Sequence, residues 1–575
     1  MTALFRCSII VVAVLLQACG GGGGSSGSKN PETNSSAPAS SAAAIISSSG
    51  ISSTISSSAG SSISSATSLG VSSSINLIIS SSIGSSLSSA IDSSISSSIG
   101  SSLGSSIDSS ISSGISSGVS SSSDSSLSSS TASSVSSSTA SSVSSSVASS
   151  ISSSSAISDL PIGTVDALPV LNITTDGGAA ILSKDTYINA SFTLSGEGIT
   201  TVEGVTEIRG RGNSTWDWVK KPYRLKLSSA TEILGMPASK HWVLLANYAD
   251  KTLMRNDVAF MFSRYTGMEY TPRSQYVELT LNGAYQGVYQ LAEHIRVAKD
   301  RVNIPELKVA DTDAEKITGG YLLEVDFRMR KDFCVTNPWA SFCLGDRNLE
   351  REATYCVDST HGMDPFCLDT PETLLDDAWS AQRDYINNYI TDTEAALFDA
   401  NFADPQLGYA AYIDVDSAVN YYLINELFKN ADGATSSFYL HKKRNGKLFF
   451  GPIWDFDLSM GNSGYVDKTD GWHIRNASWF DRLFQDPAFK AKVTARWNSL
   501  KADGTLEYIF QYAEARAIWL DKQQQKNYLL WSVTDFASWI GHGNHGGTGS
   551  YDAEVNEMIR WQRERYEWMD VELNQ

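Results

Sequence analysis

The chain has 575 residues and a formal net charge of −19, and its composition changes sharply near residue 157. All 14 Trp and all 23 Tyr fall in the 418 residues from Ser158 onward. The first part cannot bury enough apolar area to offset its chain entropy, so only the second part can fold around a core. The second part carries −17 of the charge, and a domain this acidic disfavours non-specific binding to nucleic acid.

Residues 1–19 have the features of a lipoprotein signal peptide. Arg6 is followed by an apolar run over residues 9–16, which is too short to cross a bilayer and is typical of a secretion signal. The run leads into Leu-Gln-Ala-Cys, which resembles the lipobox of bacterial lipoproteins and makes Cys19 the predicted lipidation site. We therefore expect a cell-envelope protein, an outer-membrane lipoprotein or an extracellular one, that touches the membrane through this lipid only. An ordinary signal peptide that happens to contain Cys19 is the alternative.

Residues 20–157 are mostly serine, broken by single Ile, Val, Ala and Gly residues, with only five charged residues among them. The pattern is too irregular for a solenoid repeat, and serine-rich chains of this kind act as flexible, disordered linkers. A coil of about 130 residues spans roughly 60 Å. The stretch resembles the polyserine linkers of secreted bacterial proteins that degrade polysaccharides. The sequence thus predicts a domain held well away from the membrane.

The folded part, residues 158–575, begins with a strand-rich half that extends to about residue 330. Runs of β-formers between Gly, Asn and Asp breaks predict strands, and Asn282-Gly283 is the strongest short signal for a hairpin turn. Residues 251–265 have the apolar spacing of a helix. The predicted strands are 160–175, 187–194, 200–209, 222–227, 242–245, 276–281, 285–291 and 321–327.

From about residue 371 to the end, the apolar spacing becomes helical. The expected fold class is therefore α+β, a two-lobed domain with a β-rich N-terminal lobe and a mainly helical C-terminal lobe. A folded part of this size has room for two lobes with a cleft between them. The predicted helices are 374–398, 415–428, 506–525 and 551–572.

Residues 331–370, between the two halves, hold four cysteines within 34 residues. Four cysteines in an exported protein predict two disulfides, in one of three connectivities that the sequence leaves open. A zinc site is the weaker interpretation because there is no C-x-x-C pair. We expect a stapled insertion with a structural role. The disulfide candidates are Cys334, Cys343, Cys356 and Cys367.

The first stretch that carries chemistry is residues 207–227, a run of cations in an acidic domain. Alternate residues of a strand share a face, so Arg224 and Lys226 project together. The glycine-rich turn at residues 210–214 suits close approach of backbone N–H groups to phosphate oxygens. The pattern favours an anionic partner, and a solvated basic loop is the alternative.

The second stretch is residues 430–457, which a hairpin folds back on itself. With Asn445-Gly446 as a two-residue turn, Ser436 is expected opposite Asp455. The hairpin then returns Asp455 to the segment that begins at Asp432. The sequence therefore predicts that the two carboxylates lie close together.

Asp457 lies on the same strand face as Asp455 by the two-residue period. Three carboxylates brought together with Asp432 are costly unless a cation neutralises them. Mg²⁺ prefers oxygen ligands of this kind and shares them with nucleotide phosphates. A calcium site and a surface acidic loop are the alternatives.

Several motifs in register resemble those of the spore coat protein H (CotH) kinase family, over about residues 160–462. Members of that family have an atypical protein-kinase-like fold and transfer the γ-phosphoryl group of ATP to Ser or Thr of proteins. The resemblance therefore implies ATP as phosphoryl donor, Mg²⁺ or Mn²⁺ as cofactor and a protein substrate. The motifs are Ile-Arg-Gly-Arg-Gly-Asn-Ser-Thr-Trp from residue 208, Lys-Lys-Pro-Tyr-Arg-Leu-Lys-Leu from residue 220, Ala-Asn-Tyr-Ala-Asp-Lys-Thr-Leu-Met-Arg-Asn from residue 246, Tyr-Gln-Gly-Val-Tyr-Gln-Leu-Ala-Glu from residue 285 and Gly-Pro-Ile-Trp-Asp-Phe-Asp from residue 451.

By position in these motifs, the resemblance makes Asp432 the catalytic aspartate, which orients the substrate hydroxyl and accepts its proton. Asp455 matches the metal-binding aspartate of kinases. Kinases carry a second metal ligand, an Asn, five residues after the catalytic Asp; here that position is Ser437, and Asp457 is expected to assist. Because Ser is a weaker ligand, a nucleotide-binding member without catalysis stays open. The expected ATP-binding residues are Arg209, Asn213, Ser214, Arg224 and Lys226.

The leading hypothesis is an exported, Mg-dependent atypical Ser/Thr kinase that acts on an envelope or secreted protein. The runner-up, drawn from the linker and the aromatic content, is a non-catalytic cell-surface binding module associated with polysaccharide degradation. His542 and His545 on a glycine-rich loop form a weaker candidate metal site. The tryptophans of the helical half are expected to pack the core rather than to bind sugar.

Overall fold

The sequence features at the N-terminus and near residue 540 lie outside the described part of the chain. These are the predicted signal peptide with Cys19, the serine-rich stretch at 20–157, and His542 and His545. Among the described residues, no helix is both long enough and apolar enough to span a bilayer. The computed structural model describes residues 167–338, 340, 343, 353–464, 466–534 and 548–575.

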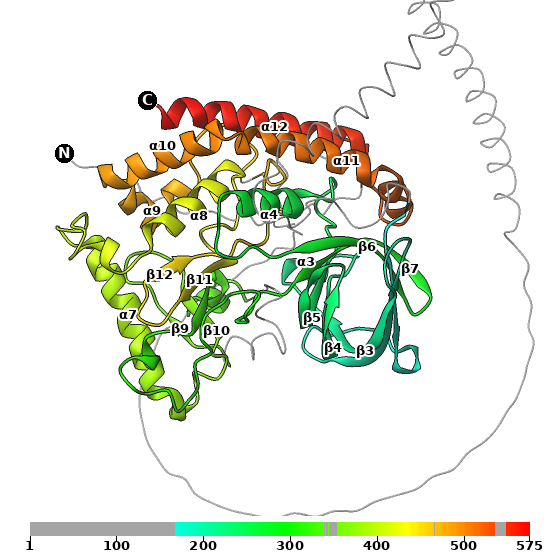
Figure 1. Cartoon of the computed structure of the whole chain (residues 1–575), viewed down its shortest axis with the longest axis horizontal. Coiled ribbons are helices and arrows are strands. Elements are labelled where there is room, and N and C mark those ends of the chain that lie inside the picture. The colour runs from blue at the N-terminus through cyan, green and yellow to red at the C-terminus, as the bar shows by residue number, and fades with distance from the viewer. Residues whose placement is uncertain (1–166, 339, 341–342, 344–352, 465, 535–547) are drawn as a thin grey trace, which may run out of the picture. The chain divides into compact units, whose positions relative to one another are not determined.

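The first strands close into a barrel, drawn in cyan and green in Figure 1, with the strand order β1-β2-β3-β4-β5-β7-β6. A parallel pairing between β1 and β6 closes it. Inward-facing residues such as Ile208, Leu225 and Trp242 fill the interior with a core of its own. The strands are β1 (Val170–Thr175), β2 (Ile188–Ser195), β3 (Val202–Gly210), β4 (Tyr223–Ile233), β5 (Met236–Leu245), β6 (Ser274–Leu281) and β7 (Ala284–Glu293).

Two tight turns set the register within the barrel. Asn282 and Gly283 adopt φ values of 51° and 78° between β6 and β7, which confirms the predicted hairpin. Leu234-Gly235 makes a second left-handed turn, with φ values of 50° and 74°, between the paired residues Ile233 and Met236. This second turn extends β4 and β5 well beyond their predicted bounds.

A second sheet has the order β12-β11-β8-β10-β9. The strand at 321–327 was expected in the β-rich N-terminal half; as β8 it pairs instead with β10 and β11, which belong to the insertion and the helical half. Leu322 and Leu323 in β8 are fully buried by these neighbours. The strands are β8 (Tyr321–Val325), β9 (Cys356–Val357), β10 (Phe366–Thr370), β11 (Phe438–Lys442) and β12 (Leu448–Phe450).

The insertion contains two disulfides, as predicted, and they join neighbouring cysteines. Cys334 bonds Cys343, and Cys356 bonds Cys367. The second bridge links β9 to β10, where the two cysteines are register partners. The insertion therefore supplies two strands to the second sheet.

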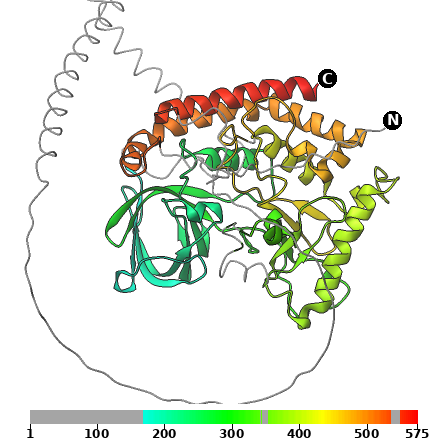
Figure 2. The same cartoon turned by 180° about the vertical axis from the view of Figure 1, so that it is seen from behind.

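The longer helices pack on one another and on the barrel. In Figures 1 and 2, α11 and α12 run side by side, and α11 also contacts α4, α10 and strand β7. The mixture of strands and helices predicted from the sequence is confirmed, whereas the closed barrel was not predicted. The helices are α3 (Ser214–Asp217), α4 (Arg255–Tyr265), α5 (Phe333–Thr336), α7 (Ser380–Phe398), α8 (Val415–Leu427), α9 (Ser478–Leu483), α10 (Pro487–Ala502), α11 (Thr505–Leu530) and α12 (Tyr551–Leu573).

Candidate functional site

The loop that carries Asp432 follows α8 directly and is held by hydrogen bonds at both ends. The backbone carbonyl of Asp432 accepts the N–H groups of Thr435 and Ser436, at 3.0 and 2.9 Å. The hydroxyl of Tyr421, on the buried face of α8, donates to the Gly433 carbonyl at 2.8 Å. These contacts fix the loop against the helix and leave the Asp432 carboxylate for other partners.

The hairpin formed by β11 and β12 brings Asp455 back to this loop, but in a register one residue away from the prediction. Leu440 pairs with Phe450 rather than Gly451, because residues 443–447 form the connection in place of a two-residue turn. Asn445 in this connection is bonded by its N–H to the Thr318 hydroxyl at 2.8 Å, which favours the longer loop.

The predicted pairing of Ser436 with Asp455 was wrong. The observed register, continued, would place Asp455 opposite Thr435, but both strands end before that point. Ser437 meets Asp455 there, with its hydroxyl donating to a carboxylate oxygen at 3.3 Å. Ser436 lies 3.3 Å from the Arg328 guanidinium. Ser437 and Asp455 are both left-handed, with φ values of 51° and 66°, a backbone state that non-glycine residues adopt mainly at constrained or functional positions.

The three predicted carboxylates interact electrostatically. Burial, and then the charge of Asp455, raises the pKa of Asp432 to about 7, while Arg328 opposes the rise. Burial, and then the charges of Asp455 and Asp432, raises the pKa of Asp457 well above its ordinary value. Two acids that resist ionisation beside a third are the electrostatic condition in which a bound cation is favourable.

The carboxylates fit a divalent ion that is completed by a ligand, not a closed protein cage. Within the described ranges, no group of three or more His, Cys, Asp or Glu side chains is arranged to hold a metal. Mg²⁺ is usually bound by one or two carboxylates together with water and substrate phosphates. Asp455 and Asp457, with the Ser437 hydroxyl beside them, match that incomplete ligand set.

Arg211 is a site residue that the sequence-based assignment missed. It follows β3 in the glycine-rich turn, and its guanidinium lies over the Trp454 ring at 5.5 Å. Burial lowers its pKa, and the charges of Asp455 and Asp457 oppose this effect. Arg211 is therefore a barrel cation that faces the acidic turn. Its signal in the sequence was the second Arg of the Arg-Gly-Arg-Gly motif.

Among the predicted ATP-binding cations, Arg224 is coupled most closely to this arrangement. Its charge acts on Arg211 and also on Asp369 of β10. Lys226 is bonded to Glu207, its partner across β3 and β4, at 2.7 Å on a half-exposed surface. Arg209 lies over the Tyr187 ring at 5.0 Å. The structure thus places Arg224 within electrostatic reach of Arg211 and pairs Lys226 with Glu207.

The turn that holds Asn213 and Ser214 is tightly built. Gly212 has a φ of 83°, and a Cβ there would lie 2.0 Å from the Thr215 hydroxyl, so only glycine fits. The Lys184 ammonium reaches the Gly212 carbonyl at 3.4 Å and the Asn213 side chain at 3.3 Å. Ser214 begins the short helix α3. A fixed, glycine-containing turn of this kind is suited to cover phosphate oxygens.

These features place a buried carboxyl, an acidic turn and a cation on neighbouring loops. A protein-family model described as CotH kinase protein matches residues 208–569, which is more than half of the chain and includes every loop described above. No curated protein matches the chain in sequence. The chain belongs to the CotH kinase protein family.

Proposed function

We propose that the protein is a Mg-dependent atypical protein kinase that transfers the γ-phosphoryl group of ATP to a Ser or Thr hydroxyl of an envelope or secreted protein. The observation that carries this proposal is the electrostatic coupling of Asp432, Asp455 and Asp457 opposite Arg211. Phosphoryl transfer depends mainly on positioning the substrate hydroxyl and neutralising the charge of the phosphates. Carboxylates that bind a metal ion, together with a nearby cation, can do both. A kinase-like, two-lobed arrangement around this site is part of the same proposal.

In this mechanism Asp432 accepts a hydrogen bond from the substrate hydroxyl and takes its proton as the oxygen bonds to phosphorus. The bond from phosphorus to the leaving oxygen breaks, and ADP departs with the electron pair. Asp455 and Asp457, assisted by Ser437, would hold the Mg²⁺ ion, which neutralises phosphate charge when bound. Arg211 and Arg224 place positive charge beside the phosphates, and the turn with Asn213 and Ser214 covers them. Arg209 extends this cationic surface, whereas Lys226 is paired with Glu207.

The direct test measures transfer from labelled ATP by the purified protein with Mg²⁺ or Mn²⁺. We expect labelled protein with either ion and none after chelation with EDTA, together with thermal stabilisation by Mg-ATP. If no transfer occurs in any metal, and glycans rather than Mg-ATP shift the thermal midpoint, the protein is a binding module and not a kinase.

Replacing Arg211 by Met tests the phosphate-binding cation. The change removes charge while keeping an unbranched side chain against Trp454, so we expect transfer to fall about 10²-fold, as for a lost charge-stabilising donor. The matched control is Lys226→Met, which removes a cation paired with Glu207 and is expected to change the rate less than tenfold. Equal losses in the two variants would contradict the assignment of Arg211.

We further propose that the protein is exported and anchored by a lipid on Cys19, with the serine-rich stretch as tether. The support is the Leu-Gln-Ala-Cys sequence and the composition of residues 20–157. Metabolic labelling with a fatty acid analogue tests this, because Cys19→Ser removes the label if the assignment is correct.

A further inference from the structure

The turn that carries Asp455 and Asp457 is hydrogen-bonded to a side chain at the N-terminal end of α4. The side-chain oxygen of Asn256, the second residue of α4, accepts the backbone N–H of Phe456 at 2.8 Å. Asn256 is 4% exposed. The peptide group between the two metal-binding candidates is therefore bonded to a buried side chain on a rigid helix that packs against α8 and α11.

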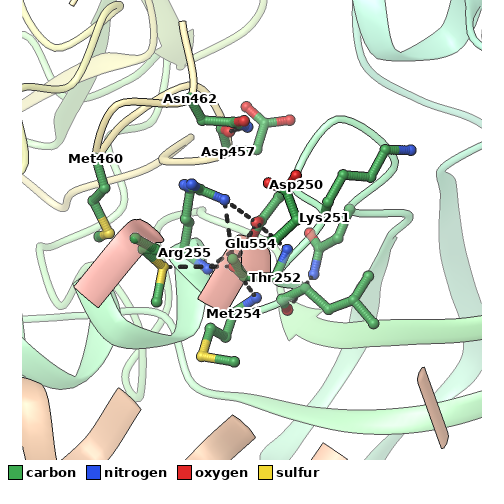
Figure 3. A network of polar contacts seen from close by, with 12 residues as sticks. Asp250, Lys251, Thr252, Met254, Arg255, Asp457, Met460, Asn462 and Glu554 are labelled. Carbon is green, nitrogen blue, oxygen red and sulfur yellow. Dashed lines mark hydrogen bonds and ion pairs between the residues drawn. The ribbon is translucent and has the colours of Figure 1, made fainter. Parts of the chain in front are cut away.

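Two further contacts hold the same turn at its other peptide groups. The Arg255 guanidinium donates to the Ser459 carbonyl at 3.1 Å, and Asp250 fixes Arg255 through a 2.6 Å ion pair. Asn462 donates to the Asp457 carbonyl at 2.6 Å and to the Ala249 carbonyl at 3.1 Å. Figure 3 shows Asp457 and Asn462 close to the pair formed by Asp250 and Arg255.

These hydrogen bonds matter most for Asp455, because its backbone conformation is unfavourable. A φ of 66° is unfavourable for a residue with a Cβ and persists only where the surroundings impose it. The bond from Phe456 to Asn256 fixes the peptide that directly follows this residue. Without that acceptor, the amide is left buried and unpaired, which favours relaxation of the turn.

The geometry points to Asn256 as a positioning residue that fixes Asp455 and Asp457 for the divalent ion; this inference rests on the proposed function. Asn256 touches neither the substrate nor the ion in this arrangement and acts through the turn. Residues that orient metal ligands typically change metal affinity or activity 10- to 100-fold when they are replaced.

The test compares three variants of the full chain. Asn256→Leu removes the acceptor at nearly constant volume, and Asn256→Asp keeps an acceptor oxygen. Asn527→Leu is the control. Asn527 is a buried asparagine on α11 that accepts the Val288 N–H at 3.1 Å and the Lys220 ammonium at 2.9 Å, both outside the turn that carries Asp455 and Asp457. The readouts are hydrogen exchange of residues 455–460 without metal, and the Mg²⁺ concentration that gives half-maximal transfer.

For Asn256→Leu we expect at least about tenfold faster exchange at residues 455–460 and a half-saturating Mg²⁺ concentration raised about 10- to 100-fold. The rate at saturating Mg²⁺ should change far less, and Asn256→Asp should restore slow exchange. Asn527→Leu should speed exchange in β7 and around Lys220, whose ammonium loses the same acceptor, but not at residues 455–460. Unchanged exchange at 455–460 in Asn256→Leu overturns the inference, whether or not the protein transfers phosphate. If the wild type transfers no phosphate but Asn256→Leu still speeds exchange at residues 455–460, only the kinase activity is refuted.

Discussion

Replacing Asp455 by Asn is expected to lower phosphoryl transfer about 10³-fold and, in the metal-free protein, to raise the thermal midpoint. The loss follows because a divalent ion contributes several kcal/mol of charge stabilisation, and each 1.36 kcal/mol is tenfold in rate. The gain follows because the charge of Asp455 raises the pKa values of Asp432 and Asp457, so the three acids repel one another. Asn keeps an oxygen for the Ser437 hydroxyl.

A fall in transfer together with a rise in the thermal midpoint distinguishes a site residue from a structural one, whose replacement lowers both. The matched control is Asp486→Asn, since Asp486 is buried and caps α10 by accepting the Ala488 N–H at 2.8 Å. This variant should transfer phosphate at the wild-type rate with an unchanged or lower midpoint. If Asp455→Asn keeps more than a tenth of the transfer, or loses stability together with activity, Asp455 does not hold the ion.

The acidic half of the site could be predicted from the sequence because its signals are local. Asp432 and Asp455 flank one hairpin, and any register of that hairpin returns one to the neighbourhood of the other. The exact partner could not be predicted, since the connection between β11 and β12 is fixed by Thr318, a residue more than a hundred positions away. That register, continued, would place Asp455 opposite Thr435. The bond between Ser437 and Asp455 instead forms beyond the ends of the two strands, where both residues have left-handed backbones.

The cationic half was harder to predict because it depends on barrel pairing. Strand period shows that Arg224 and Lys226 share a face, but not that Glu207 lies opposite Lys226 and pairs with it. The long turn between β3 and β4 hides that register. The closure of the barrel itself rests on the parallel pairing of β1 with β6, about a hundred residues apart, for which no local pattern exists.

One missed element did have a readable signal. Helix α10 begins at Pro487 after Asp486, which caps it, and Pro at the first helical position is a standard start signal. Its buried residues Phe489, Val493 and Trp497 recur every four positions. The prediction of this region failed through incomplete use of the pattern rather than through its absence.

The second large effect concerns pH. Because the pKa of Asp432 lies near 7 in the folded, metal-free protein, its carboxyl stays protonated in a range where the unfolded chain has already lost the proton. The folded state then binds more protons than the unfolded state between about pH 4 and 7, so stability falls as the pH rises through this window. Asp457, whose pKa is also raised, acts in the same direction.

Binding of Mg-ATP should lower the raised pKa values of Asp432 and Asp457, because a cation beside the acids favours their ionised forms. We expect apparent Mg²⁺ affinity to rise about tenfold per pH unit for each proton released. The contribution of Asp432 is then roughly 100-fold from pH 5 to 7 and levels off above its pKa. Proton release on adding Mg-ATP at pH 6.5, measured in a weak buffer, checks this directly. Asp432→Asn should remove the proton released by Asp432 and leave the proton released by Asp457. The stability of the metal-free variant should also fall less steeply as the pH rises. An affinity that is independent of pH across this range would mean that the three acids do not face the ion, because any carboxyl that must ionise to accommodate it has to release its proton on binding.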